Sequence, residues 1–200
     1  MVKNAIENIN KAINLDPKNS LNYAIKTQIL QFKGIYKEAL KTIKKAIEMD
    51  PNVANYYSDL AYILIWMNKF EKAIKAINKA IEIEPTVAEY YSQLASVYCF
   101  LNQYEKALET LSIAIKIDPK MTQFRLQKAR YLAYYMKKYK DALRVIEEVI
   151  NPNLEKFSLF ELYKEQAGIL LSMKNNEAAL SVIKKAKQIY PHKEIYPNIY

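Results

Sequence analysis

The chain has 200 residues, of which 51% are hydrophobic, and its formal net charge is +9. It contains 2 glycines, far below the roughly 7% of an average protein, and so few turn residues do not suit a β-sandwich or β-barrel. The longest apolar run covers residues 60–67, much shorter than the about 20 residues of a membrane-spanning helix, so we expect no membrane insertion. Cys99 is the single cysteine, which excludes an intrachain disulfide and favours a cytoplasmic or other reducing intracellular compartment.

The first predicted element is a helix within residues 1–19. Its apolar residues Val2, Ala5, Ile9 and Ala12 follow each other at three- and four-residue steps, which places them on one face. No earlier helix precedes it in this sequence, so we expect this apolar stripe to be exposed. A symmetric homodimer through this end is one interpretation. The alternative is an array of helices that was cut short.

The rest of the chain repeats itself with a period of 34 residues. The repeat is marked by prolines, by alanines twelve and five residues before each proline, and by tyrosines six residues after it. These are Pro17, Pro51, Pro85 and Pro119; Ala5, Ala39, Ala73 and Ala107; Ala12, Ala46, Ala80 and Ala114; and Tyr23, Tyr57 and Tyr91. Two amphipathic helices fit between successive prolines, and proline ends the second of them.

The register changes after Pro119. Tyr139 and Ala142 continue the pattern one residue late, residues 151–159 form a linker, and the pattern resumes before Pro191. We therefore expect an orphan helix in 1–19, repeats at 20–53, 54–87, 88–121, 122–154 and about 157–191, and a C-terminal tail at 192–200. This organisation predicts an all-α fold with eleven helices and no strand. Lys187 replaces an isoleucine of the other repeats, so we expect it to face water at the end of the array.

These features resemble the tetratricopeptide repeat (TPR), a 34-residue helix–turn–helix unit. The family's first-helix pattern matches Tyr57, Leu60, Ala61 and Leu64, and its second-helix pattern matches Phe70, Ala73, Ile77, Ala80 and Pro85. The resemblance implies a right-handed α-solenoid of antiparallel helix pairs. A generic helical bundle is the alternative, and four prolines in register argue against it.

In TPR arrays the first helices of successive repeats line a concave groove. The resemblance therefore implies a non-enzymatic protein–protein interaction scaffold that binds a peptide segment or partner protein in this groove. The expected contacts are Asp59, Tyr62, Trp66, Gln93, Phe100, Gln127, Arg130 and Tyr134. The alternative for Trp66 and Phe100 is that they only pack near the helix ends.

One TPR subclass grips the C-terminal carboxylate of chaperone tails with lysine, asparagine and arginine side chains. The corresponding positions here are Ala24, Gln28, Asp59, Glu89 and Gln93, or, one repeat later, Ser58, Tyr62, Gln93, Gln123 and Gln127. Neither set can clamp an anion, so we do not expect a chaperone tail as the partner.

Residues for catalysis are missing from the sequence. His192 is the single histidine, Cys99 is the single cysteine, and no glycine-rich phosphate loop occurs. We therefore expect no enzyme, no cofactor and no metal. The competing function is RNA binding through residues 125–144, where arginines and lysines alternate with tyrosines. A solvated helix end with buried tyrosine rings explains the same stretch.

Overall fold

The structure of the chain is a computed structural model that describes residues 2–151, 153–193 and 195, without the side chains of residues 2 and 3. These residues form eleven α-helices, one π-helical turn and no β-strand, which confirms the predicted all-α fold. The helices are α1 (Val2–Leu15), α2 (Ser20–Phe32), α3 (Tyr36–Met49), α4 (Ala54–Trp66), α5 (Phe70–Ile83), α6 (Ala88–Phe100), α7 (Tyr104–Ile117), α8 (Thr122–Arg130), α9 (Tyr139–Glu147), α10 (Lys156–Ser172) and α11 (Asn176–Ile189). The π-helical turn is η1 (Tyr131–Tyr135).

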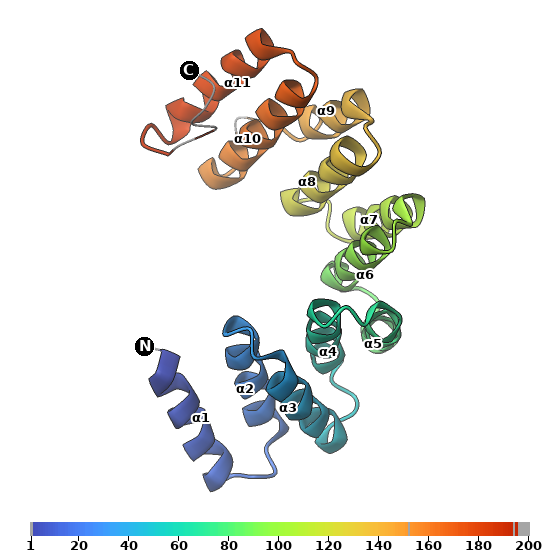
Figure 1. The fold of residues 1–200 in the computed structure, drawn as a ribbon, viewed down its shortest axis with the longest axis vertical. Helices are drawn as coiled ribbons and strands as arrows, with labels where there is room; N and C mark the ends of the chain where they lie inside the picture. The colour runs from blue at the N-terminus through green and yellow to red at the C-terminus, as the bar shows by residue number, and fades with distance from the viewer. Residues whose placement is uncertain (1, 152, 194, 196–200) are drawn as a thin grey trace. The chain divides into compact units, whose positions relative to one another are not determined.

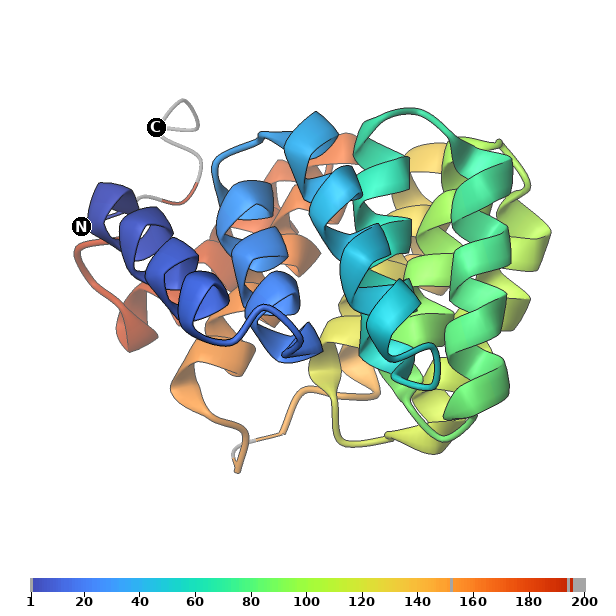
Figure 2. The same ribbon diagram turned by 90° about the horizontal axis from the view of Figure 1, so that it is seen from below.

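The helices belong to two compact units, Met1–Ile117 and Asp118–Tyr200. In the first unit α2 pairs with α3, α4 with α5 and α6 with α7, while α1 packs against α2 (Figure 1). In the second unit α8 pairs with α9 and α10 with α11. The two helices of each pair in the first unit also lie side by side when seen from below (Figure 2). We call the first member of each pair the first helix and the second member the second helix.

Small residues allow the paired helices to approach closely. The repeated alanines of α3, α5 and α7 have no exposed surface, and the apolar residue between them is equally buried. These residues are Ala39, Ile43 and Ala46, Ala73, Ile77 and Ala80, and Ala107, Leu111 and Ala114. A methyl group at these sites fills the space between two backbones, and any longer side chain would have to push them apart.

The turn inside each pair has one residue in the left-handed conformation. These residues are Gly34, Asn68, Asn102, Lys137 and Lys174, with φ between 56° and 70°. In the first unit the next residue donates a backbone hydrogen bond to the carbonyl five residues earlier, as Lys69 does to Leu64 at 2.8 Å. This closes the first helix with a Schellman-type cap. Glycine and asparagine adopt this conformation most readily, which explains their place at three of the five turns.

The periodic tyrosine connects each first helix to the loop before it. The hydroxyls of Tyr23, Tyr57 and Tyr91 donate to the carbonyls of Pro17, Pro51 and Pro85 at 3.1, 2.9 and 3.0 Å. Arg125 takes over this role in the second unit, where its guanidinium donates to the carbonyl of Pro119. The tyrosine thus gives a hydrogen-bond partner to a backbone carbonyl of the loop that joins two helix pairs.

The one-residue change of register after Pro119 is absorbed inside a first helix. Residues 131–135 form the π-helical turn η1. The Lys138 N–H donates to the carbonyl of Leu132, six residues earlier, at 2.8 Å. In the other helix pairs the corresponding hydrogen bond reaches the carbonyl five residues earlier. A π-turn accommodates one extra residue without breaking the helix. The helix pair α8–α9 therefore keeps its packing, and Ala142 and Ile146 are fully buried.

The residues after Pro191 cover part of the last helix pair. Ile195 is 2% exposed and packs in the cluster that α10 and α11 form. The Lys193 ammonium lies 4.7 Å from the ring centroid of Phe160 and 5.2 Å from those of Phe157 and Tyr190. Lys187, which we expected to face water, is half-buried. Residues 194 and 196–200 of the predicted tail lie outside the described residues.

We expect Ala73→Leu and Ala107→Leu each to lower the free energy of unfolding by about 1–3 kcal/mol, because a larger side chain overpacks the helix contact. Both alanines are 0% exposed. Urea unfolding followed by circular dichroism measures the change. Glu109→Leu, an added leucine at an exposed position of α7, is the control. If all three variants unfold like the parent, the tight packing at these alanines is disproved.

Candidate functional site

A row of exposed aromatic side chains lies at the C-terminal ends of the first helices in the first unit. Phe32, Trp66 and Phe100 are the last residues of α2, α4 and α6, and they are 82%, 58% and 57% exposed. We call these three residues the aromatic row. Trp66 and Phe100 were predicted from the sequence and Phe32 was not, although all three are spaced by the 34-residue period.

Two members of the row are held by rings from the preceding helix pair. Tyr36 stacks on Trp66 with the ring centroids 5.7 Å apart and the planes 6° from parallel. Phe70 stacks on Phe100 with the ring centroids 5.6 Å apart and the planes 17° from parallel. Tyr62, which is 39% exposed, lies 6.1 Å from Trp66 with a tilted ring. The rings are therefore fixed on one side while more than half of their surface stays open to a ligand.

The polar residues expected on the same face bond to neighbouring helices. Gln28 donates to a carboxylate oxygen of Asp59 at 3.3 Å, and Gln31 donates to the Asp59 backbone carbonyl at 3.0 Å. The Ser58 hydroxyl donates to the Gln93 side-chain oxygen at 3.0 Å. These bonds connect α2 to α4 and α4 to α6, so Asp59 and Gln93 have a structural role in addition to any contact with a ligand.

Asp59 is partly buried, and this environment disfavours its charge. Burial raises the pKa of Asp59 above its ordinary value, and the hydrogen bond from Gln28 opposes the rise. Gln28 already uses part of the acceptor capacity of this carboxylate, and the rest remains for other donors.

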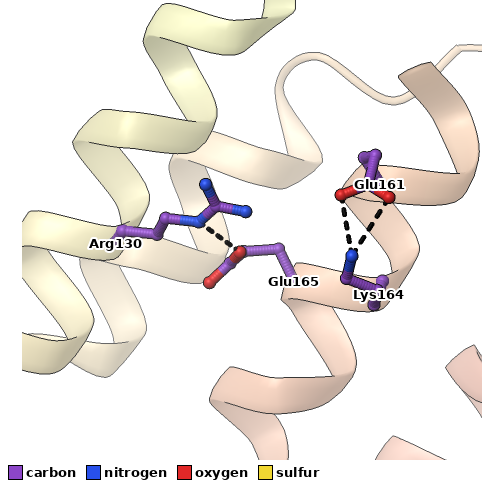
Figure 3. Close-up of polar contacts among 4 residues, drawn as sticks. All are labelled: Arg130, Glu161, Lys164 and Glu165. Carbon is purple, nitrogen blue, oxygen red and sulfur yellow. Dashed lines mark hydrogen bonds and ion pairs between the residues drawn. The ribbon is translucent and has the colours of Figure 1, made fainter. Parts of the chain in front are cut away.

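The three site residues predicted in the second unit also interact within the chain. Gln127 donates to the Tyr131 hydroxyl at 2.7 Å. Arg130, at the end of α8, donates from Nε to the carboxylate of Glu165 on α10 at 2.6 Å, and Glu165 is 5% exposed (Figure 3). Tyr134 lies in η1 and is 39% exposed. The sequence did not indicate Glu165 as the partner of Arg130, because the two residues are in different helix pairs.

The basic stretch 125–144 has its arginines occupied. Arg125 bonds to Pro119, Arg130 to Glu165, and Arg144 to Asp141 at 2.8 Å. The exposed cations that remain are lysines, among them 137, 138 and 140. Each of these bonds uses part of a guanidinium group that an RNA phosphate could otherwise contact.

The apolar face of α1 is less exposed than predicted. Ile9 is 8% exposed, so the expectation of an open side chain at this position is wrong. Ile6 and Ile13 pack against the cluster around Tyr23 and Ala24 of α2, and Ile9 shares their face of the helix. Ala5 and Ala12 are half-buried, and the side chain of Val2 lies outside the described residues. A homodimer through this end stays a prediction, with a smaller apolar surface to support it.

Among the described residues, no three histidine, cysteine, aspartate or glutamate side chains come together in a way that would hold a metal ion. No helix in this part of the chain combines the length and the apolar character needed to cross a membrane. Cys99 is 6% exposed and packs inside the first unit.

We expect Arg130→Ala to lower the free energy of unfolding by about 3 kcal/mol, because it leaves the Glu165 carboxylate buried and unpaired. Arg144→Ala removes an exposed pair with Asp141 on one helix and should change stability by about 0.5 kcal/mol or less. Chemical denaturation measures both, and a double-mutant cycle with Glu165→Ala isolates the pair. Equal losses in the two arginine variants would contradict a structural role for Arg130.

Asp59→Asn should make the protein more stable at pH 7. A raised pKa means that the folded protein holds the Asp59 proton more tightly than the unfolded chain does. The stability that this proton contributes is present at low pH and is lost as the pH rises through the raised pKa. The advantage of the asparagine variant should therefore shrink as the pH falls through that range. Glu109→Gln, at an exposed carboxylate, is the control, and thermal melts from pH 3 to 8 provide the measurement. A less stable asparagine variant at pH 7 would show that the Gln28 bond outweighs burial.

Two family models match the sequence. The model described as tetratricopeptide repeat matches residues 33–97, and the model described as anaphase-promoting complex, cyclosome, subunit 3 matches residues 66–149. Together they extend from the end of α2 to the end of α9. A comparison with curated protein sequences gives no match.

Solved structures share the fold. PilW, described as a widely conserved type IV pilus biogenesis factor, superposes with a TM-score of 0.80 over 96% of this chain and 88% of its own, at 17% identity. A tetratricopeptide repeat protein from Parabacteroides merdae superposes with a TM-score of 0.73, over 100% of this chain and 76% of its own, at 22% sequence identity. YrrB, described as a TPR protein with an unusual peptide-binding site, superposes with a TM-score of 0.61, over 94% of this chain and 95% of its own, at 22% sequence identity. With the periodic alanines buried between paired helices and the matches of both family models, the chain belongs to the tetratricopeptide repeat family.

Proposed function

We propose that the first-helix side of the first unit binds a peptide segment of a partner protein, with the aromatic row and Tyr62 as its anchors. The tetratricopeptide repeat fold is in general a scaffold for interactions between proteins, and the family is typically non-enzymatic. The single observation that carries the finer proposal is Trp66, which is 58% exposed while Tyr36 fixes its ring by stacking.

Rigid exposed rings suit the role of anchors. Tryptophan and tyrosine are enriched among the residues that dominate binding energy at interfaces. A ring that is already ordered loses little conformational entropy when a ligand covers it. Stacking by Tyr36 and Phe70 gives Trp66 and Phe100 this advantage before any ligand arrives.

Polar groups next to the row can orient the peptide. The bond from Ser58 uses only the side-chain oxygen of Gln93, so the amide N–H groups of Gln93 can serve as donors to a peptide carbonyl. Asp59 keeps acceptor capacity on its carboxylate beside the bond from Gln28. The face thus combines apolar anchors with a few polar groups, as peptide-binding surfaces commonly do.

The experiment begins with selection of peptides from a random library on the purified protein. Trp66 is the one tryptophan of the chain, so its fluorescence reports directly on a ligand that covers the row. We expect selected peptides to quench or shift this fluorescence, and to keep their affinity after nuclease treatment and at raised salt concentration. Nucleic-acid binding would instead weaken steeply as the salt concentration rises.

Trp66→Ala and Tyr62→Ala should each weaken binding by more than about tenfold, because anchors of this type carry most of the affinity. Calorimetry measures the affinity, since the first variant has lost the fluorophore. Phe157→Ala is the matched control, because Phe157 on α10 is also 58% exposed. Unchanged affinity in both variants, with their helical content intact, would place the peptide elsewhere on the molecule.

A further inference from the structure

A second surface feature of the first unit is a pocket between second helices, and no residue of the aromatic row is among those that line it. The pocket of about 390 Å³ is bordered by α3 and α5 and has residues of α4 in its lining. Its apolar part consists of Leu40, Tyr57, Leu60, Leu64 and Ala76. Leu64 and Ala76 are buried, and the other three are half-buried. This volume is within the range of pockets that bind small molecules or single side chains.

Lysines form the whole charged part of this pocket. The lining contains five of them and no carboxylate: Lys44, Lys69, Lys72, Lys75 and Lys79. Lys79 forms an ion pair with Glu82 at 2.9 Å. In the described part of the chain, Lys44, Lys69, Lys72 and Lys75 have no ion pair. Four ammonium groups without an ion pair, around the five apolar residues, favour a positive potential at the opening of the pocket.

The neighbouring second helices do not share this charge pattern. The residues 34 positions after Lys69, Lys72, Lys75 and Lys79 are Gln103, Lys106, Glu109 and Ile113. The residues 34 positions before them are Ile35, Glu38, Lys41 and Lys45, and the pocket next to α3 contains Glu38, which pairs with Lys26 at 3.3 Å. Of these three second helices, only α5 with the residue before it has a lysine at all four positions. The 34-residue repeat therefore does not impose this charge pattern.

We propose that this pocket binds an acidic peptide segment of a partner protein that carries a bulky apolar side chain. The apolar side chain enters between Leu60, Leu64 and Ala76, where it leaves water. Aspartate or glutamate side chains on either side of it meet Lys72 and Lys75 on α5 and Lys44 on α3. No residue of the aromatic row is among those that line this pocket, and binding here does not depend on the function proposed there.

The test uses a fluorescein-labelled peptide with two leucines flanked by aspartates and glutamates. Binding to the full chain is followed by fluorescence polarisation in buffers of low and moderate salt concentration. We expect Lys72→Gln combined with Lys75→Gln to weaken binding by about tenfold, the sum of two partly exposed ion pairs. A second variant, Lys44→Gln with Lys69→Gln, should give a similar loss and serves if the first one folds poorly.

The matched control is Lys106→Gln with Lys116→Gln, which removes the same charge from the next second helix, α7. We expect this variant to bind the peptide like the parent. A peptide in which serine replaces both leucines should bind at least about tenfold more weakly, because the apolar contribution is lost. Trp66→Ala should leave the affinity for this peptide unchanged, because Trp66 does not line the pocket, and this separates the site from the aromatic row.

Three results would overturn the proposal. Equal weakening in the α5 and α7 variants would mean a general attraction to a basic protein. Equal affinity of the leucine and serine peptides would show that the apolar residues of the pocket do not contribute to binding. Tighter binding of an RNA oligonucleotide of the same charge, lost in the α5 variant, would identify a phosphate-binding surface instead.

Discussion

The close approach of paired helices at their alanines is the constraint on which the rest of the first unit depends. Ala39, Ala73 and Ala107 have no exposed surface, and the turn inside each of these pairs begins at the same point of the 34-residue period. Residues that are 34 positions apart then recur at equivalent places on one side of the unit. This is why Phe32, Trp66 and Phe100 form a row, although each belongs to a different pair.

The same constraint explains how an irregular repeat is tolerated. An extra residue in a helix rotates everything after it by about 100°, which would turn Ala142 and Ile146 away from their partner helix. The π-turn at residues 131–135 takes up this residue before the second helix begins. Arg130, directly before the turn, bonds to Glu165 of the next helix pair at 2.6 Å. The irregular helix is thereby tied to its neighbour at the point where its own backbone pattern changes.

Much of the fold could be predicted from the sequence, because the prolines and alanines report local geometry. The exposed rings Trp66 and Phe100 could be predicted for the same reason, since their position in the period places them at helix ends. The partners of Asp59, Gln93 and Arg130 could not, because those bonds join residues 31 to 35 positions apart and depend on the distance between helices. Ile9 was wrongly predicted to be exposed because it belongs to two overlapping apolar stripes of α1, one with Ala5 and Ala12 and one with Ile6 and Ile13. The second stripe packs against α2, and this buries Ile9.

The lysine pocket was missed for a different reason. Net charge summed along residues 51–100 is close to zero, but a sum along the chain ignores the face on which each charge lies. Lys72, Lys75 and Lys79 follow each other at three- and four-residue steps and therefore share one side of α5. Polar residues between first helices, by contrast, are largely used to join those helices. We therefore propose that this chain recognises partners through the groups that helix packing does not use, which are the exposed rings of the aromatic row and the unpaired lysines of the pocket between α3 and α5.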